Sequence, residues 1–169
     1  MQEESGQAVL QTLISEVEEM RKVQLEVTRK MRILSRTKSY ETDYNLLFSI
    51  PGISLITGMT FLTEIEDINR FSSTDHFASY VGLIPSCHST GNEENNGEIT
   101  SRAKKILRDL IVECAWCATR KDPALHMAFC KLCKRMEPNK AIIRIARKLL
   151  NRIYHVLKTK TKYVYGTVD

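Results

Sequence analysis

The side chains best suited to chemistry lie in one polar stretch, residues 82–99, and in the basic segment that follows it. The stretch offers hydroxyl groups at Ser89 and Thr90. A hydroxyl can attack a phosphodiester when it lies in line with the leaving oxygen and cations neutralise the developing charge. The following segment supplies cations at Arg102, Lys104, Lys105 and Arg108. Serine and threonine are also common in polar loops, so their types alone leave their role open.

Four of the five cysteines form two C-x-x-C pairs, Cys114/Cys117 and Cys130/Cys133, with 12 residues between the pairs. Such spacing occurs in zinc sites. Both pairs lie inside predicted helices, however, and no turn residue follows either pair to let the chain wrap a metal. Cysteine also serves as a small buried apolar residue. We therefore predict no metal site, and a zinc-containing module remains the alternative.

The acidic residues indicate no catalytic group. Glu64, Glu66 and Asp67 end a predicted helix and flank a turn, where acids are common surface residues. Three further acids, Glu93, Glu94 and Glu98, lie in the polar stretch. Nothing in the sequence brings these carboxylates together, so we predict that they are solvated.

The charge is strongly segregated along the chain. Residues 1–99 carry 8 Lys/Arg and 15 Asp/Glu, a net of −7, whereas residues 100–169 carry 17 and 5, a net of +12. A compact segment this basic repels itself unless anions screen it, and phosphates are the usual anions. The pattern favours nucleic-acid binding, with solvated helix faces docked on the acidic half as the alternative.

A Pro-Gly turn is a second place where phosphate could bind. The segment LFSIPGISLITGMTFLTEI reads as helix, turn and helix over residues 45–66, a helix-hairpin-helix shape. Backbone N–H groups at the start of the second helix, near Gly52, Ile53 and Ser54, could hold a DNA phosphate without reading a base. A purely structural hairpin of two helices is the alternative.

Composition narrows the class of protein. The chain has 169 residues, of which 43% are hydrophobic, so it can form one core plus an appendage. No run approaches 18 apolar residues, and the N-terminus lacks the apolar segment of a signal peptide, so neither a membrane span nor secretion is predicted. Five cysteines without a secretion signal indicate a reducing compartment.

Residues 8–35 predict one long helix with a heptad seam. Apolar residues alternate three and four apart, with a polar interruption at Gln24. The seam residues are Leu10, Leu13, Val17, Met20, Gln24, Val27, Met31 and Leu34. A seam of this length needs a partner helix, which favours a coiled coil within or between protomers. An amphipathic helix packed on the domain is the alternative.

The remaining patterns predict an all-α chain: the long N-terminal helix is followed by a helical domain with a helix-hairpin-helix and one long polar loop. We divide the chain into a heptad helix and linker (1–43), a helical domain (44–160) and a tail (161–169). Within the domain, the loop covers residues 82–99 and basic helices cover 100–158. Ser73, Asp122-Pro123 and Pro138 mark helix starts. On the last helix six basic residues are expected to face outward: Lys140, Arg144, Arg147, Lys148, Arg152 and Lys158.

The order of several sequence blocks resembles one family. The blocks IPGI, TEIEDINRF, FASYVGLIP, STG and GEIT, followed by a basic helix, resemble the transposases of the insertion-sequence 110 family over about residues 45–158. The resemblance implies a C-terminal, serine-bearing domain that is joined by a coiled coil to an N-terminal RuvC-like domain with metal-binding acids. It also implies oligomers that exchange DNA strands and are guided by a non-coding RNA.

The resemblance also points to the nucleophile. The family serine follows a Gly-Leu-X-Pro block and directly precedes a glycine, and in this chain that position is Thr90, with Ser89 just before it. The chain departs from the family here, because the methyl group of a threonine crowds the attack. Either Ser89 or Thr90 is the expected nucleophile.

The interpretation that follows is a DNA-binding transposase domain. The cations expected to contact DNA are Arg102, Lys104, Lys105, Arg108, Arg144 and Lys148. We expect no RuvC-like domain before residue 8, and hence no cofactor in this chain, a divalent metal such as Mg²⁺ belonging to that domain. We expect little strand exchange by the chain alone, a homo-oligomer through the N-terminal helix, and a bacterial cytoplasmic, nucleoid-associated location. The alternatives are a non-enzymatic nucleic-acid-binding regulator that pairs with an intact transposase, and a helical scaffold unrelated to DNA.

Overall fold

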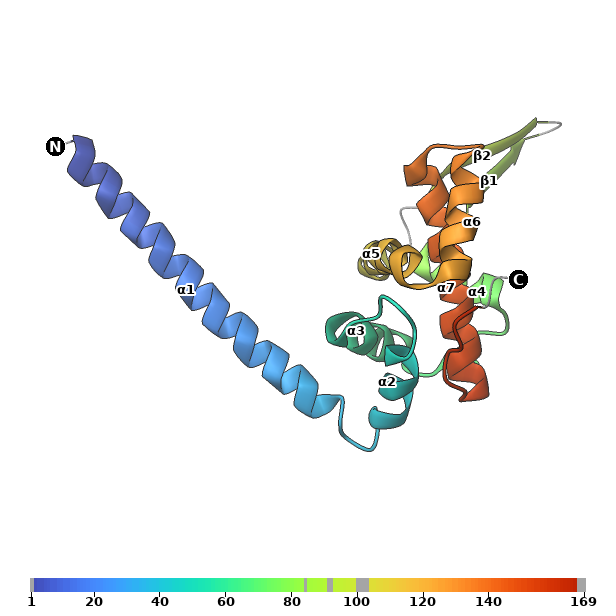
Figure 1. Cartoon of the computed structure of the whole chain (residues 1–169), viewed down its shortest axis with the longest axis horizontal. Coiled ribbons are helices and arrows are strands. Elements are labelled where there is room, and N and C mark those ends of the chain that lie inside the picture. Colours follow the sequence, from blue (N-terminus) through green and yellow to red (C-terminus); the bar gives the residue numbers. More distant parts are fainter. Residues whose placement is uncertain (1, 84, 91–92, 100–103, 167–169) are drawn as a thin grey trace.

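The computed structural model describes the backbone of residues 2–83, 85–90, 93–99 and 104–166, and the side chains of residues 5–83 and 104–166. These residues form α-helices, one short 3₁₀ helix and one pair of strands (Figure 1). In chain order the elements are α1 (Gln2–Leu34), α2 (Glu41–Phe48), α3 (Leu55–Ile65), η1 (Ile68–Arg70), α4 (Thr74–Val81), β1 (Pro85–Thr90), β2 (Glu93–Ile99), α5 (Lys105–Lys121), α6 (Pro123–Cys133) and α7 (Pro138–Thr159). The predicted helical architecture is confirmed.

Helix α7 is the centre of the helical body. It packs against α2, α4, α5 and α6, and its inward face is fully buried at Ile145, Leu149 and Ile153. Each large apolar side chain removed from water in this way stabilises the fold by about 1.5–3 kcal/mol. Helices α2 and α3 lie at one end of the body, and the strands project from the other end (Figure 1).

Local sequence signals set the helix starts, as predicted for Ser73 and Asp122. The Ser54 hydroxyl accepts a hydrogen bond from the Thr57 N–H at 3.3 Å, and the Ser73 hydroxyl accepts one from the His76 N–H at 3.1 Å. The Asp122 carboxylate caps α6 through the Ala124 N–H at 2.9 Å. These caps satisfy N–H groups that have no partner inside the helix.

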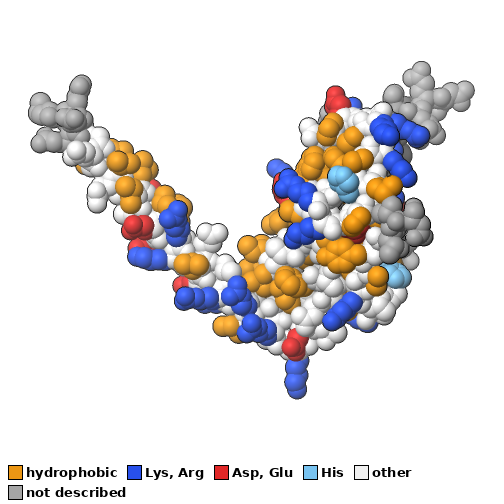
Figure 2. Space-filling view, in the orientation of Figure 1, with side chains coloured by type: hydrophobic (Ala, Val, Ile, Leu, Met, Phe, Trp, Pro, Cys, Tyr) orange, Lys and Arg blue, Asp and Glu red, His pale blue; other side chains and the backbone are white. Residues whose placement is uncertain are grey.

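Helix α1 is longer than predicted and projects away from the body (Figure 1). Its contact with the body is at its last turns, where it meets α3 and Met31 packs against the core. The rest of its apolar surface lies open, as Figure 2 shows, with Leu13 52% and Met20 69% exposed. The structure therefore does not bear out the alternative of a helix packed along the domain.

The polar stretch that we predicted as a long loop is instead a two-stranded antiparallel hairpin. Strands β1 and β2 pair in register from Ser86↔Gly97 to Thr90↔Glu93, with an irregularity between Pro85 and Ser86. Backbone hydrogen bonds hold such a ladder, and they do not require the apolar alternation that usually announces a strand. This stretch lacked that alternation, so the sequence pattern favoured a loop.

The chain after α7 turns back onto the body. Lys160 has a φ of 55° and pairs through its ammonium with the Asp43 carboxylate at 2.6 Å. The Tyr163 N–H donates to the Ser49 hydroxyl at 2.9 Å, just before the α2–α3 turn. The described part of the tail is therefore attached to the body at Lys160 and Tyr163, while most of its side chains are exposed. None of the described helices combines the length and apolarity needed to cross a membrane.

Candidate functional site

The two candidate nucleophile positions lie near the closed end of the β1–β2 hairpin. Ser89 stands opposite Glu94 in the register, and Thr90 stands opposite Glu93. At about 3.3 Å per residue along a strand, Thr90 lies about 16 Å from Pro85 at the root. The two positions therefore project well beyond the helical body. Their side chains lie outside the described residues.

Lys104, one of the predicted DNA-binding cations, lies at the root of the hairpin. Its N–H donates to the Tyr80 carbonyl at 3.4 Å, and its ammonium pairs with the Glu64 carboxylate at 2.9 Å. The hydrogen bond that the ammonium donates to Glu64, and then the attraction of the carboxylate charge, raise the pKa of Lys104 above its ordinary value. A lysine paired in this way is less free to bind phosphate. Arg102 lies outside the described residues.

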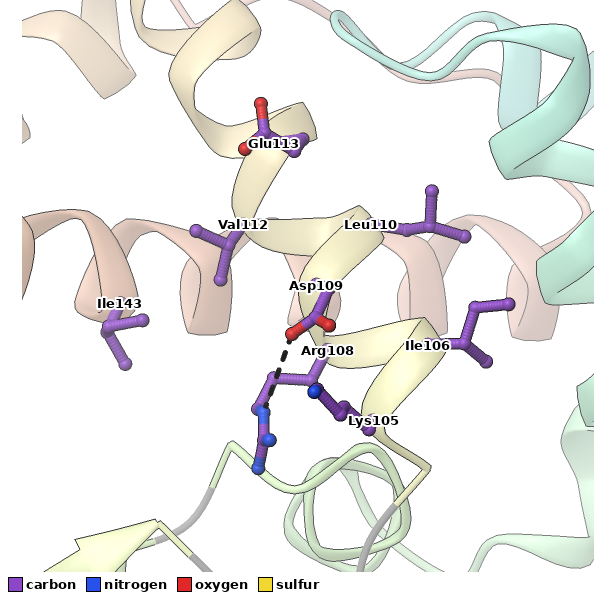
Figure 3. Close-up of a pocket in the computed structure, with 8 residues that line it drawn as sticks. All are labelled: Lys105, Ile106, Arg108, Asp109, Leu110, Val112, Glu113 and Ile143. Carbon is purple, nitrogen blue, oxygen red and sulfur yellow. Dashed lines mark ion pairs between the residues drawn. The ribbon is translucent and has the colours of Figure 1, made fainter.

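Lys105 and Arg108 line a hollow of about 740 Å³ on the first half of α5 (Figure 3). Its wall also includes Ile106 and, from α7, Ile143. The Arg108 guanidinium lies 4.0 Å from the Asp109 carboxylate, so the hollow carries charges of both signs. Its rim is cationic where α5 begins, close to the hairpin root.

The basic residues of α7 divide into two groups. Arg144 and Lys148 are exposed, and because they are four apart they share one face of the helix. Ile143, which directly precedes Arg144, is the α7 residue that lines the hollow on α5. Arg147 and Arg152, which we predicted to face outward, instead pair with Asp75 and with the buried Asp122. That prediction was wrong for these two arginines, which are half-buried and pair with acidic residues of other segments.

The α2–α3 turn has an inner and an outer side. Gly52 has a φ of +91°, and a Cβ added there would lie 2.4 Å from the Cys114 carbonyl oxygen of α5. Ile53 is buried, whereas Ser54 is exposed at the start of α3. Of the three residues predicted to contact DNA in this turn, Gly52 and Ile53 pack on the body and Ser54 faces outward.

The paired cysteines do not converge on a metal site. Cys114 is buried, and burial raises the pKa of its thiol to about 11. Cys117 and Cys130 are exposed, and all four thiols of the two pairs are free. Among the described residues, no group of three or more His, Cys, Asp or Glu side chains could hold a metal ion. The zinc alternative therefore gains no support, and Cys114 serves as a buried apolar residue.

Sequence similarity identifies the family of this helical body. Residues 44–130 match the family described as Transposase IS116/IS110/IS902 family, a range that runs from α2 into α6 and includes the turn, the hairpin and α5. This chain belongs to the IS116/IS110/IS902 transposase family. The resemblance seen in the sequence blocks is thereby confirmed.

Curated relatives of this transposase-family chain agree with that assignment. The transposase for insertion sequence element IS1111A of Coxiella burnetii is 28% identical over 128 residues, which cover 73% of this chain and 35% of that protein. The pilin gene-inverting protein of Moraxella bovis is 35% identical over 133 residues, which cover 75% of this chain and 40% of that protein. The chain thus spans less than half the length of these relatives.

Sequence reasoning missed one residue near the hairpin of this family member. We expected Glu64 to be solvated, but its carboxylate pairs with Lys104, and its side chain is only 32% exposed. No local signal could reveal this, because the two residues are brought together by packing of α3, α4 and α5.

Proposed function

We propose that this chain is a DNA-binding part of a transposase and that its β1–β2 hairpin carries the hydroxyl nucleophile for strand exchange. The observation that supports this most is the family match over residues 44–130, which contain both the hairpin and the basic start of α5. In this proposal Ser89 or Thr90 attacks a DNA phosphodiester. The hydroxyl oxygen forms a bond to phosphorus, the leaving deoxyribose oxygen departs, and the hydroxyl proton passes to a base.

DNA binding in this proposal rests on exposed cations of two helices. Lys105 of α5 and Arg144 and Lys148 of α7 are exposed and carry no ion pair among the described residues. The α2–α3 turn packs at Cys114, nine residues along α5 from Lys105, which is about 14 Å on a helix. The major groove of B-DNA is about 12 Å wide, so one duplex could contact both places.

Metal chemistry in this proposal belongs to a RuvC-like domain, as the resemblance implies. The acidic side chains among the described residues do not fit a magnesium site, because no three candidate ligands come together. We therefore expect this chain by itself to bind DNA without completing strand exchange. A guide-type RNA, and a second copy associated through α1, are the partners we propose for the complete reaction.

The DNA-binding part of the proposal can be tested by fluorescence anisotropy with a short duplex. Three phosphate contacts predict that affinity falls about 40-fold between 50 and 200 mM salt. Replacing Lys105, Arg144 and Lys148 together by Gln should remove most of this salt dependence. Lys22→Gln on α1, whose ammonium pairs with Glu19, is the matched control. No binding of DNA or RNA at low salt would reject the proposal.

The nucleophile is tested in a complete transposase that carries this sequence. Loss of exchange in Ser89→Ala or Thr90→Ala, with DNA affinity retained, identifies the attacking residue. Unchanged exchange in the double variant would contradict a hydroxyl nucleophile at these positions. The chain would then bind nucleic acid as a non-enzymatic partner of an intact transposase.

A further inference from the structure

The β1–β2 hairpin has two ends, which we call its roots: the first follows α4 and the second precedes α5. The first root is fixed by the main chain. Helix α4 ends at Gly82, which has a φ of 83°, and both the Gly82 N–H and the Leu83 N–H donate to the Ala78 carbonyl at 2.9 Å. This is the usual glycine-ended closure of a helix. Leu83 is buried, so the chain leaves the body from a well-anchored position.

The second root is the start of α5, where the Lys104 carbonyl accepts hydrogen bonds from the Leu107 N–H at 3.0 Å and the Arg108 N–H at 3.2 Å. The chain re-enters the body at Lys104, where the main-chain hydrogen bond to the Tyr80 carbonyl is 3.4 Å long, beyond the usual range. The ion pair between the Lys104 ammonium and the Glu64 carboxylate is much shorter, at 2.9 Å. The Glu64 carboxylate therefore adds a side-chain link from α3 to this root.

Glu64 is itself held in place by its own carbonyl. The Tyr80 hydroxyl donates to the Glu64 carbonyl at 3.0 Å, and the Arg70 guanidinium donates to the same oxygen at 3.4 Å. The Arg70 guanidinium lies 4.7 Å from the centre of the Tyr80 ring and 4.8 Å from that of Phe71. The carboxylate thus extends towards Lys104 from a backbone position that the Tyr80 and Arg70 side chains contact.

We propose that Glu64 is a positioning residue for the β1–β2 hairpin: by pairing with Lys104 it ties α3 to the start of α5, beside the hairpin, and so contributes to where Ser89 and Thr90 lie relative to DNA. This inference rests on the proposed function for the role of those two hydroxyls. The anchoring itself rests only on the contacts of Glu64 and Lys104.

Because Glu64 lies in α3, its pairing with Lys104 also connects the hairpin to the α2–α3 turn. Ser54 lies at the start of α3, on the outer side of the α2–α3 turn, and Glu64 lies near its end. Ten residues of helix separate them, which is about 15 Å. The buried residues Met59, Phe61 and Leu62 hold α3 rigidly in the body. One fixed helix therefore connects the proposed phosphate-binding turn with the root of the hairpin.

The anchor can be tested by amide hydrogen exchange of residues 85–99 in the whole chain. Glu64→Ala removes the carboxylate but keeps the carbonyl that Tyr80 and Arg70 contact. Because partly exposed ion pairs have modest effects, exchange in the hairpin should become about two- to fivefold faster. Lys104→Ala should have the same effect, and the two changes together should add nothing further. Reversing the pair, with Glu64→Lys and Lys104→Glu, should restore slow exchange.

A control separates this anchoring from a general loss of stability. Glu113→Ala, which removes an exposed carboxylate from the middle of α5, should leave exchange in the hairpin unchanged. Unchanged hairpin exchange in Glu64→Ala would overturn the inference, and so would an equal acceleration throughout α5 and α7. In the complete transposase, Glu64→Ala should lower strand exchange several-fold although DNA affinity does not fall, since the Lys104 ammonium is then free to bind phosphate. If hairpin exchange responds as expected but the chain binds no DNA, the anchor stands and the proposed function fails.

Discussion

Helices α1 and α7 are both long and amphipathic, yet they end in opposite surroundings. Helix α7 has 22 residues and buries its apolar face against neighbouring helices, with Ile145, Leu149 and Ile153 fully buried. Helix α1 has 33 residues and leaves Leu13 and Met20 open to solvent. Periodicity predicts a helix and the face that needs covering, but it does not say what covers that face. The helical body supplies partners for α7, whereas most of α1 finds none in the chain that the structure describes.

The largest test of this contrast is the same substitution in both helices. Leu149→Ala should lower the free energy of unfolding by about 2–5 kcal/mol, because it leaves a cavity in a closed core. Leu13→Ala should change it by less than about 0.5 kcal/mol at concentrations where the chain is monomeric, because the side chain is already exposed. Urea denaturation of both variants measures the difference. Equal losses would mean that α1 is covered within one molecule.

Two glycines of the α2–α3 hairpin, Gly52 and Gly58, differ in how closely other atoms approach them, and so give a second test. In Gly52→Ala the new methyl group would lie 2.4 Å from the Cys114 carbonyl oxygen, at a φ of +91°. Strain of this kind costs about 1–3 kcal/mol, and thermal unfolding should show the loss. Gly58→Ala is the control, because its methyl group would meet Ile53 and Tyr44 at an ordinary 3.5 Å inside α3. A stable Gly52→Ala variant would show that the turn does not pack on α5.

The elements that the sequence predicted well depend on short-range signals. Ser54, Ser73 and Asp122 each cap a helix through N–H groups two or three residues ahead, so local sequence suffices to place them. The long seam of α1 and the buried face of α7 are likewise repeated local patterns. These signals correctly predicted the helices and the start of the α2–α3 hairpin.

What the sequence did not predict depends on residues far apart in the chain. The pairing of Glu64 with Lys104, and of Arg152 with Asp122, arises only when separate helices pack together. The β1–β2 hairpin was not predicted for a different reason: its ladder is made of backbone groups that every sequence carries. The site was therefore predicted as a set of residue types, whereas their grouping required the structure.

The polar contacts of α7 give a third, smaller test of how tightly it is held. The Asp122 carboxylate is buried, and it accepts from the Arg152 guanidinium of α7 at 3.0 Å and from the Tyr163 hydroxyl of the tail. Burial pushes its pKa upward. The hydrogen bonds from Tyr163, Leu125 and Ala124, together with the charge of Arg152, outweigh burial, so the pKa lies below its ordinary value.

A lowered carboxylate pKa stabilises the fold above the ordinary value of 3.8, and this stability is lost as the pH falls through the folded-state value. Asp122→Asn keeps a residue able to cap α6 but removes the charge. It should cost about 1–2 kcal/mol at pH 7, since Arg152 is partly exposed, and progressively less below about pH 4. Urea denaturation from pH 3 to pH 7 measures this. A cost independent of pH would contradict an ionised Asp122.

The smallest effect on stability, and the sharpest test of α1, comes from Val17→Lys. Val17 lies in the middle of the heptad seam and is 48% exposed, so a lysine there should leave the unfolding of the helical body unchanged. If two copies associate through the seam, the same lysine places a charge in their shared interface, where it has no partner. Analytical ultracentrifugation should then show a concentration-dependent larger species for the parent chain and a monomer for the variant. Lys22→Gln, on the same helix but off the seam, should associate like the parent. A parent chain that stays monomeric at high concentration would contradict association of two copies through the seam. The apolar face of α1 would then need a different protein to cover it, whereas α7 is covered within its own chain.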